Sequence, residues 1–265
     1  MPHPFFDLPG PLAIGHRGCA GERPENTLVS FAKACEDGAQ ILESDVHVTR
    51  DGVPVLLHDD DVSRVSDGTG QVRDLSLAEL QRLDAGHHFT APDGTHPFRG
   101  QGVQVPALAE ALAALPGMRF NLELKEDLPD LIEATVEVVR DADREALTLL
   151  TAAEDPLMAR LRKHVESVGS SVALGACTGE VAGFALAARD GTPPPDGPMA
   201  LQIPTHFVGQ PLVTPALLDA AHAAGVQVHV WTINEPDEIA ALLALGVDGI
   251  VSDHPARVVA ARAGA

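Results

Sequence analysis

The amino-acid sequence predicts an α/β protein: a TIM-type (β/α)8 barrel with a small insertion over one rim. Two observations support this fold class. Short apolar runs, typical of buried strands, alternate with Ala- and Leu-rich helical patterns almost to the end of the chain, as expected of a parallel sheet. The length of 265 residues also suits one barrel of this kind. We therefore expect residues 1–265 to form a single barrel domain.

The candidate strands exceed by one the number that a barrel needs, so one of them must have a different role. The link between the second and third runs is short and contains Asp51-Gly52, a turn signal, whereas a parallel crossover usually needs a helix. A hairpin there would place residue 58 opposite residue 45. Alternatively, 54–58 is a true barrel strand and 248–251 is an extra closing strand; both arrangements fit the sequence. The candidate strands are 11–15, 40–46, 54–58, 118–124, 147–151, 171–175, 199–203, 226–231 and 248–251.

Capping residues and glycines mark the helices between these strands. A capping residue next to an early proline starts several of them, as in Asp155-Pro156 and Thr214-Pro215. Glycines such as Gly38 and Gly246 follow the ends of the periodic runs. The candidate helices are 25–37, 106–115, 128–141, 155–166, 214–224, 235–245 and 255–262.

The stretch from about 59 to 105 breaks the strand–helix rhythm. It is polar and rich in glycine, with one helical piece from Ser76 to Leu83. A segment of this length is too long for an ordinary loop, so it is interpreted as an insertion over the active rim of the barrel.

Composition excludes several kinds of partner. The formal net charge is −20, whereas binding to nucleic acid or to an anionic membrane needs an excess of Lys and Arg. No apolar stretch approaches the roughly 18 residues that cross a bilayer, and the first ten residues have no signal-peptide pattern. Cys19, Cys35 and Cys177 lack metal-binding spacing and are interpreted as reduced thiols, with Cys19 packing in the core. We expect a cytoplasmic protein with no nucleic-acid partner and no stable membrane association; the oligomeric state stays open.

Three carboxylates at the ends of apolar runs predict a metal site. Glu43 and Asp45 are two residues apart on one strand, so their side chains point to the same face. Two carboxylates that face the same way repel each other unless a cation lies between them, and hard cations such as Ca²⁺ and Mg²⁺ prefer oxygen ligands. Glu123, on another strand, can complete a site for one divalent metal ion. The alternative is that these carboxylates are simply solvated at the strand ends.

Two histidines lie at comparable positions and fit a general acid and base pair. His16 and His58 follow apolar runs, next to Arg17 and Asp59 respectively. An imidazole titrates near pH 6.5, so it can accept or donate a proton at neutral pH. Alternatively, either histidine is a core residue or a metal ligand.

Positive charge for a phosphate can come from Arg17, which bonds bidentately, and from Lys125, which acts as a point charge. A salt bridge to a neighbouring glutamate is the alternative role of Lys125. Trp231, the only tryptophan, ends an apolar run and can form a wall for part of a substrate, although a purely structural role is nearly as well supported.

With these residues in place, the chain resembles the glycerophosphodiester phosphodiesterase family. The resemblance spans nearly the whole chain except 147–198, where the assignment of elements depends on the strand–helix rhythm alone. Ser44 stands where the family usually has an apolar residue, and its side chain is expected to face away from the site. The matching segments are Gly15-His-Arg-Gly18, Pro24-Glu-Asn-Thr27, Ile41 to Thr49, Asp51-Gly52, His58-Asp59, Asp67 to Val72, Val105-Pro-Ala-Leu108, Asn121-Leu-Glu-Leu-Lys125, Trp231-Thr-Ile-Asn234 and Gly246 to Asp253.

The resemblance implies a TIM barrel that hydrolyses glycerophosphodiesters to sn-glycerol 3-phosphate and an alcohol. It implies one divalent metal ion, Ca²⁺ or Mg²⁺, held by Glu43, Asp45 and Glu123. It also implies catalytic His16 and His58, with phosphate contacts from Arg17 and Lys125.

Two other functions are compatible with the sequence. A lysophospholipase D-type activity would need an apolar entry for an acyl chain, and the insertion is mostly polar. A non-catalytic barrel that binds a phosphate ligand would not need a paired acid and base. The retained histidines therefore favour the phosphodiesterase.

Overall fold

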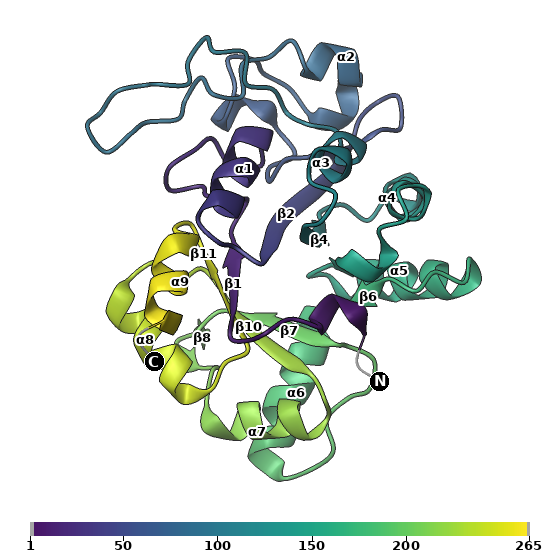
Figure 1. Ribbon diagram of the computed structural model, residues 1–265. Helices are drawn as coiled ribbons and strands as arrows, with labels where there is room; N and C mark the ends of the chain where they lie inside the picture. The colour runs from purple at the N-terminus through teal and green to yellow at the C-terminus, as the bar shows by residue number, and fades with distance from the viewer. Residues whose placement is uncertain (1–2, 264–265) are drawn as a thin grey trace.

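The computed structural model describes residues 3–263, which form a nearly closed barrel of 8 parallel strands surrounded by helices (Figure 1). The parallel strands are β1 (Leu12–Gly15), β2 (Ile41–Val48), β4 (Arg119–Leu124), β5 (Thr148–Thr151), β6 (Ala173–Leu174), β7 (Ala200–Ile203), β10 (Gln227–Val230) and β11 (Gly249–Ser252). Their order is β6-β5-β4-β2-β1-β11-β10-β7, and a bridge between Gly175 and Ala200 joins the two ends. The predicted fold class is confirmed.

The additional strand, β3 (Pro54–Leu56), forms an antiparallel hairpin with β2 and lies outside the barrel order. Gly52 adopts a φ of +80° in the turn, a conformation that favours glycine. The hairpin alternative is therefore correct, and β11 is an ordinary barrel strand between β1 and β10. The expected register is wrong by one residue, because Leu57 N donates to Asp45 O and thus residue 57 lies opposite residue 45.

Alternate residues of each strand face the barrel interior. On β2, Ile41 packs in an apolar layer, and Glu43 and Asp45 line a cavity further along the same face. The fully buried Phe5, in the short helix η1 (Pro4–Phe6), packs with this apolar layer at the amino ends of the strands. The floor of the barrel is therefore apolar, and its polar side chains gather toward the other end.

Helices cover the outside of the barrel at the predicted places, with one helix that the sequence did not indicate. The unexpected helix is α6 (Thr178–Asp190). Most of its apolar side chains are alanines, and Phe184 and Ala187 are its only buried residues, so its apolar face is narrow. The others are α1 (Leu28–Glu36), α3 (Leu108–Ala114), α4 (Pro129–Asp141), α5 (Asp155–Ser167), α7 (Pro215–Ala223), α8 (Pro236–Leu245) and α9 (Pro255–Ala263).

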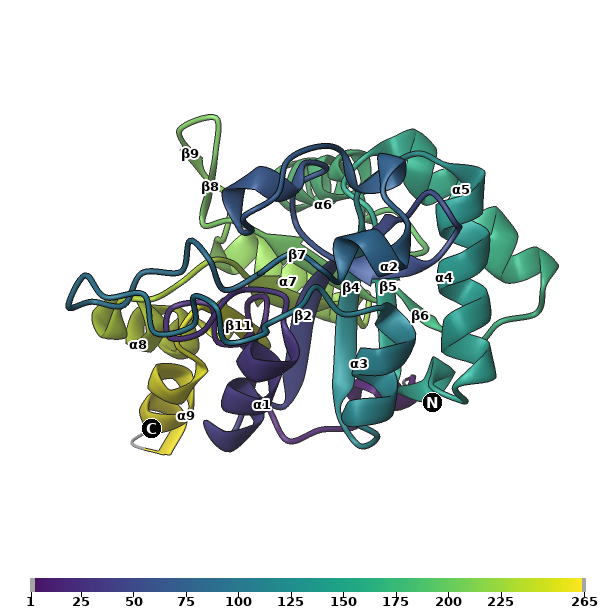
Figure 2. The same cartoon turned by 90° about the horizontal axis from the view of Figure 1, so that it is seen from above.

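The insertion follows β3 and packs on the β2–β3 hairpin, beyond the carboxyl end of the barrel (Figure 2). It contains the short helices η2 (Val62–Arg64), η3 (Val72–Asp74) and α2 (Leu77–Leu80), the last of which is shorter than the predicted 76–83. A small apolar cluster, which includes the fully buried Val62 and Leu80 of the insertion and Val55 of β3, holds it against the hairpin.

A second hairpin, which the sequence did not predict, follows β7. Strands β8 (His206–Phe207) and β9 (Gln210–Pro211) project from the same end of the barrel as the insertion (Figure 2). Phe207 is 56% exposed and Val208 is 85% exposed at its tip. Among the residues described, no helix has both the length and the apolar character needed to cross a bilayer.

The contact between Phe31 of α1 and Phe120 of β4 leads to a stability prediction. Both rings are fully buried and meet edge to face, with centroids 5.8 Å apart. Phe120→Ala should lower the free energy of unfolding by about 3–5 kcal/mol, because it removes this contact and leaves a cavity. Denaturant titration would measure the loss, with the exposed Phe207→Ala as a control expected to change stability by less than about 0.5 kcal/mol. Equal losses in both variants would contradict the packing described.

Candidate active site

A cavity of about 310 Å³ opens at the carboxyl end of the barrel. It brings together side chains that are far apart in the sequence, since neighbouring parallel strands end at the same rim. All eight residues singled out from the sequence line it: His16, Arg17, Glu43, Asp45, His58, Glu123, Lys125 and Trp231.

The three carboxylates come from the adjacent strands β2 and β4, where Asp45 is in register with Glu123. Glu43 Oε2 accepts a hydrogen bond from the backbone N–H of Arg17 at 3.0 Å. Burial raises the pKa of Glu43 to about 8, and the charge of Asp45 adds to this effect. A carboxyl group in such surroundings is poorly compensated and would be stabilised as an anion by an additional cation.

A hydrogen-bonded pair outside the cavity supports Asp45. Asn26 Nδ2 donates to Asp45 Oδ2 at 3.0 Å, and the Ser44 hydroxyl donates to Asn26 Oδ1 at 2.6 Å. Ser44 is absent from the cavity lining, which agrees with the expectation that it faces away. It nevertheless contributes to the orientation of Asp45 through Asn26.

Two cationic side chains lie against these carboxylates. Lys125 Nζ is 3.4 Å from Asp45 Oδ1 and 3.3 Å from Glu123 Oε2. Burial lowers the pKa of Lys125, but the two carboxylates outweigh that effect and raise it overall. Arg17 Nε lies 3.4 Å from Asp45 Oδ2 and makes no hydrogen bond among the described residues, although it is buried. This buried part of the guanidinium therefore faces the Asp45 carboxylate and balances part of its charge.

The donor set fits a hard divalent cation in chemical type. Glu43, Asp45 and Glu123 supply oxygen atoms, the ligands that Ca²⁺ and Mg²⁺ prefer. In the described part of the chain these three carboxylates do not all lie within 4.8 Å of one another, and Lys125 bridges two of them.

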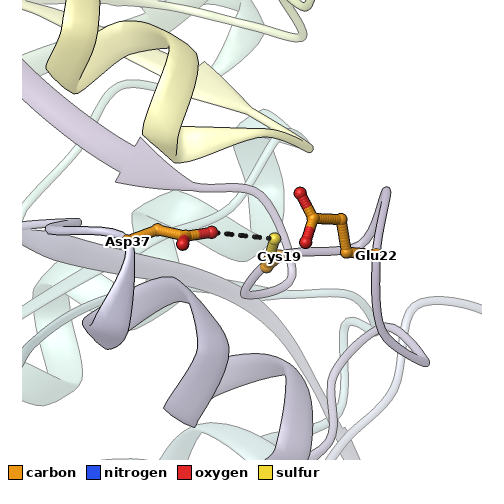
Figure 3. A group of neighbouring side chains, drawn as sticks. All are labelled: Cys19, Glu22 and Asp37. Atoms are coloured by element: carbon orange, nitrogen blue, oxygen red, sulfur yellow. Dashed lines mark hydrogen bonds between the residues drawn. The ribbon is translucent and has the colours of Figure 1, made fainter.

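A different group of potential ligands within the described residues does have its ligand atoms within 4.8 Å of one another: Cys19, Glu22 and Asp37 (Figure 3). Lys33 already balances part of its negative charge, because Lys33 Nζ contacts Asp37 and lies 3.3 Å from Glu22 Oε2. Burial raises the pKa of the Cys19 thiol to about 12, so it stays protonated at neutral pH. Cys19 is fully buried, in agreement with the predicted packing role.

His16 is oriented by a carboxylate at the end of β11. Its Nδ1 lies 2.7 Å from Asp253 Oδ1, and Asn234 Nδ2 donates to the other oxygen of Asp253 at 2.7 Å. Burial lowers the pKa of His16, but the hydrogen bond to Asp253 and the charge of Glu43 outweigh it and raise the pKa above 6.5.

His58 is held in the same manner by a carboxylate from the insertion. Its Nδ1 lies 2.7 Å from Asp59 Oδ1, and Arg64 Nε donates to Asp59 Oδ2. Burial raises the pKa of Asp59, but its bonds to Arg64 and His58 lower it overall, so this carboxylate is ionised at neutral pH. Neither His16 nor His58 uses Nε2 in a hydrogen bond within residues 3–263.

Comparison with known proteins identifies the family. The model of the glycerophosphoryl diester phosphodiesterase family matches residues 16–257. The chain belongs to this family. It is 35% identical over 256 residues to a probable glycerophosphodiester phosphodiesterase 2 of Mycobacterium tuberculosis. The aligned region covers 94% of this chain and 90% of that protein. The predicted enzyme class, a phosphoric diester hydrolase, is confirmed.

Solved structures of glycerophosphodiester phosphodiesterases share the fold. A glycerophosphoryl diester phosphodiesterase domain from Mycobacterium tuberculosis superposes with a TM-score of 0.85 at 22% identity, over 97% of this chain and 100% of that one. A phosphodiesterase of Oleispira antarctica, solved in complex with the product sn-glycerol-3-phosphate, gives a TM-score of 0.75 at 29% identity, over 94% and 96% of the two chains.

The cavity and its surroundings also include residues that sequence reasoning did not single out. Asp253 directly follows the apolar run of β11, and Asp45 and Glu123 belong to the apolar runs of β2 and β4 in a similar way. The same reasoning could therefore have found Asp253. Gln202, which lines the cavity and donates to Asn121 at 3.3 Å, also lies on an apolar strand. Arg64 lies in the insertion, where no strand indicates the direction of a side chain.

The contact between His16 and Asp253 predicts a change in titration. Asp253→Asn should lower the pKa of His16, because burial and Arg17 still oppose its positive charge while one attracting charge is lost. The neutral form of His16 would then persist to lower pH than in the parent protein. NMR titration of the imidazole would measure this shift. Asp248→Asn, which changes a similar contact at 2.8 Å to the distant His222, is the control; an equal shift of His16 in both variants would refute the assignment of cause.

Proposed function

We propose that this protein hydrolyses glycerophosphodiesters to sn-glycerol 3-phosphate and an alcohol, with His16 and His58 as the base and the acid. One observation carries the proposal. Two imidazoles, each with Nδ1 at 2.7 Å from a carboxylate, line the same cavity as three carboxylates and two cationic side chains. A barrel that merely binds a phosphate ligand has no use for two histidines supported in this way.

The proposal includes one divalent metal ion, Ca²⁺ or Mg²⁺, held by Glu43, Asp45 and Glu123. The raised pKa of the buried Glu43 supports it, as does the general metal dependence of the family. When bound, such an ion polarises a phosphoryl oxygen and offsets the charge that develops on it.

The side chains of the site suit an in-line displacement at phosphorus. His16 takes the proton of the attacking hydroxyl as the new P–O bond forms, and His58 gives a proton to the leaving oxygen as the old P–O bond breaks. The attacker is either water or the free 2-hydroxyl of the glycerol, which would form a transient cyclic phosphate that water then opens. Arg17 and Lys125 stabilise the charge on the phosphoryl oxygens.

The substrate of this reaction is a small phosphodiester. A net charge of −20 opposes nucleic acid as a partner and stable association with an anionic membrane. Trp231, which is 43% exposed at the cavity, would form a wall beside the glycerol or the alcohol group. All three cysteines are free, which is compatible with the cytoplasmic location that we propose.

A second candidate function is lysophospholipase D-type hydrolysis. The observation that favours it is the β8–β9 hairpin, which exposes Phe207 and Val208. The hairpin begins shortly after Gln202, a residue of the cavity. It could offer an acyl chain the apolar contact that the polar insertion does not.

The proposed substrates and metal can be tested together. Turnover of glycerophosphocholine and glycerophosphoethanolamine should release sn-glycerol 3-phosphate, and excess EDTA should abolish it. Glu43→Gln should lose metal binding, measured by calorimetry, and nearly all turnover while it stays folded. The exposed Glu137→Gln on α4 is the control. Full activity in EDTA would refute metal dependence, and much faster cleavage of a monoacyl diester would favour the second candidate.

The roles of the two histidines can be separated with different leaving groups. Each His→Ala change should slow hydrolysis of an alkyl diester by roughly 10²- to 10⁴-fold. A p-nitrophenyl diester needs little proton donation, so it should restore turnover to His58→Ala and not to His16→Ala. Steady-state rates of both variants on both substrates provide the measurement. Restoration of His16→Ala alone would reverse the assignment, and equal behaviour of the two variants would show it to be wrong.

A further inference from the structure

A chain of ion pairs connects His58 to the barrel through the first residues of the insertion. Arg64 Nε donates to Asp59, the carboxylate that contacts His58. The same guanidinium donates two hydrogen bonds to Glu25, from Nη1 to Oε2 at 2.8 Å and from Nη2 to Oε1 at 2.7 Å. Glu25 in turn accepts a hydrogen bond from Arg17 Nη1 at 2.8 Å. Opposite charges therefore alternate from Arg17 to Asp59.

The geometry of Arg64 makes it a rigid link. A planar guanidinium can donate to two carboxylates at once in fixed directions. Glu25 is a firm anchor, because its side chain is only 18% exposed and is bonded from both sides. Burial raises the pKa of Glu25, but the bonds to Arg64 and Arg17 lower it overall, so it is ionised at neutral pH.

We infer that Arg64 is a positioning residue for proton donation to the leaving group: it fixes Asp59, which in turn fixes the ring of His58. The inference rests on the proposed function, in which His58 is the acid. With Nδ1–H donated to Asp59, the protonated ring carries its other proton on Nε2, which is the nitrogen left for the leaving oxygen. That proton passes from Nε2 to the oxygen as the P–O bond breaks, and His58 becomes neutral.

The alternative role of Arg64 is to fasten the insertion to the barrel without any effect on His58. A single exposed ion pair usually contributes little to stability, and Arg64 is 46% exposed. Arg50 offers a matched comparison, since it lies in the turn after β2 and also joins the insertion to a neighbouring part of the fold. Its Nη2 donates to Glu79 at 2.6 Å and its Nη1 donates to the carbonyl of Asp74 at 2.6 Å, with no contact to the cavity.

The test compares Arg64→Gln with Arg50→Gln on two diesters of glycerol 3-phosphate, one with ethanolamine and one with p-nitrophenol as the leaving group. Misplacement of the acid should lower the turnover of the ethanolamine diester by roughly 10- to 100-fold in Arg64→Gln. The p-nitrophenyl diester should be affected far less, because it needs little proton donation. Arg50→Gln should keep the parental ratio of the two rates.

A double-mutant cycle tests whether Arg64 acts through Asp59. Asp59→Asn should show the same dependence on the leaving group, and the variant with both changes should be no slower than the slower single variant. Asp59→Asn combined with Arg50→Gln should instead show multiplied effects. If Arg64→Gln does not fold, the rates of Asp59→Asn on the two diesters are compared instead.

Several results would overturn the inference. One is an equal fall in the turnover of both diesters in Arg64→Gln. Another is a change in the ratio of the two rates in Arg50→Gln that equals the change in Arg64→Gln. A third is a double variant, Arg64→Gln with Asp59→Asn, in which the losses of the two single variants multiply. In a fourth, the loss of turnover in His58→Ala depends on the leaving group while the losses in Arg64→Gln and Asp59→Asn do not. That result would overturn this inference and leave the proposed function intact. No such dependence in His58→Ala would overturn the acid role of His58, and the inference with it.

Discussion

Repulsion among Glu43, Asp45 and Glu123 is the constraint around which the open end of the barrel is organised. The alternation of residues on β2 and the register of β2 with β4 bring these carboxylates to one cavity, and Glu43 is buried there with its pKa raised to about 8. Such a cluster is stable only when positive charge surrounds it. Lys125 and Arg17 supply part of that charge. In the proposed function the same positive side chains also hold the phosphate, so one balance of charge would serve both the carboxylates and the anionic substrate.

The two histidines illustrate how different parts of a fold can produce the same local arrangement. His16 is supported by Asp253 from the end of a barrel strand, whereas His58 is supported by Asp59 from the start of the insertion. The first support is therefore part of the rigid sheet. The second is connected through Arg64 to Glu25 in the loop between β1 and α1, which gives the insertion a part in the geometry of the site.

The elements that sequence reasoning found are those whose residues repeat a simple period or end an apolar run. The barrel strands and the eight cavity residues belong to this group, and the gathering of these residues at one rim follows from parallel strand topology. The β2–β3 hairpin was one of two alternatives that the sequence left open. The helix α6 was missed because alanines and glycines give little apolar contrast between its faces. The β8–β9 hairpin and Arg64 were missed because a loop has no period from which the direction of a side chain can be read. The register error at His58 arose at the hairpin turn, because turn type and loop length set the register and the Asp51-Gly52 signal alone does not give that length.

The apolar floor has a kinetic consequence. Phe5 and the layer beneath Glu43 close the amino end of the barrel, so a molecule in the cavity must enter and depart through the same opening. The two products of bond cleavage then leave in an order set by how deep each lies in the cavity. The fragment that contacts the charged side chains is retained longer than the one nearer the mouth. Such an enzyme should be inhibited competitively by its phosphorylated product, and its flux would depend on how quickly the cell removes that compound.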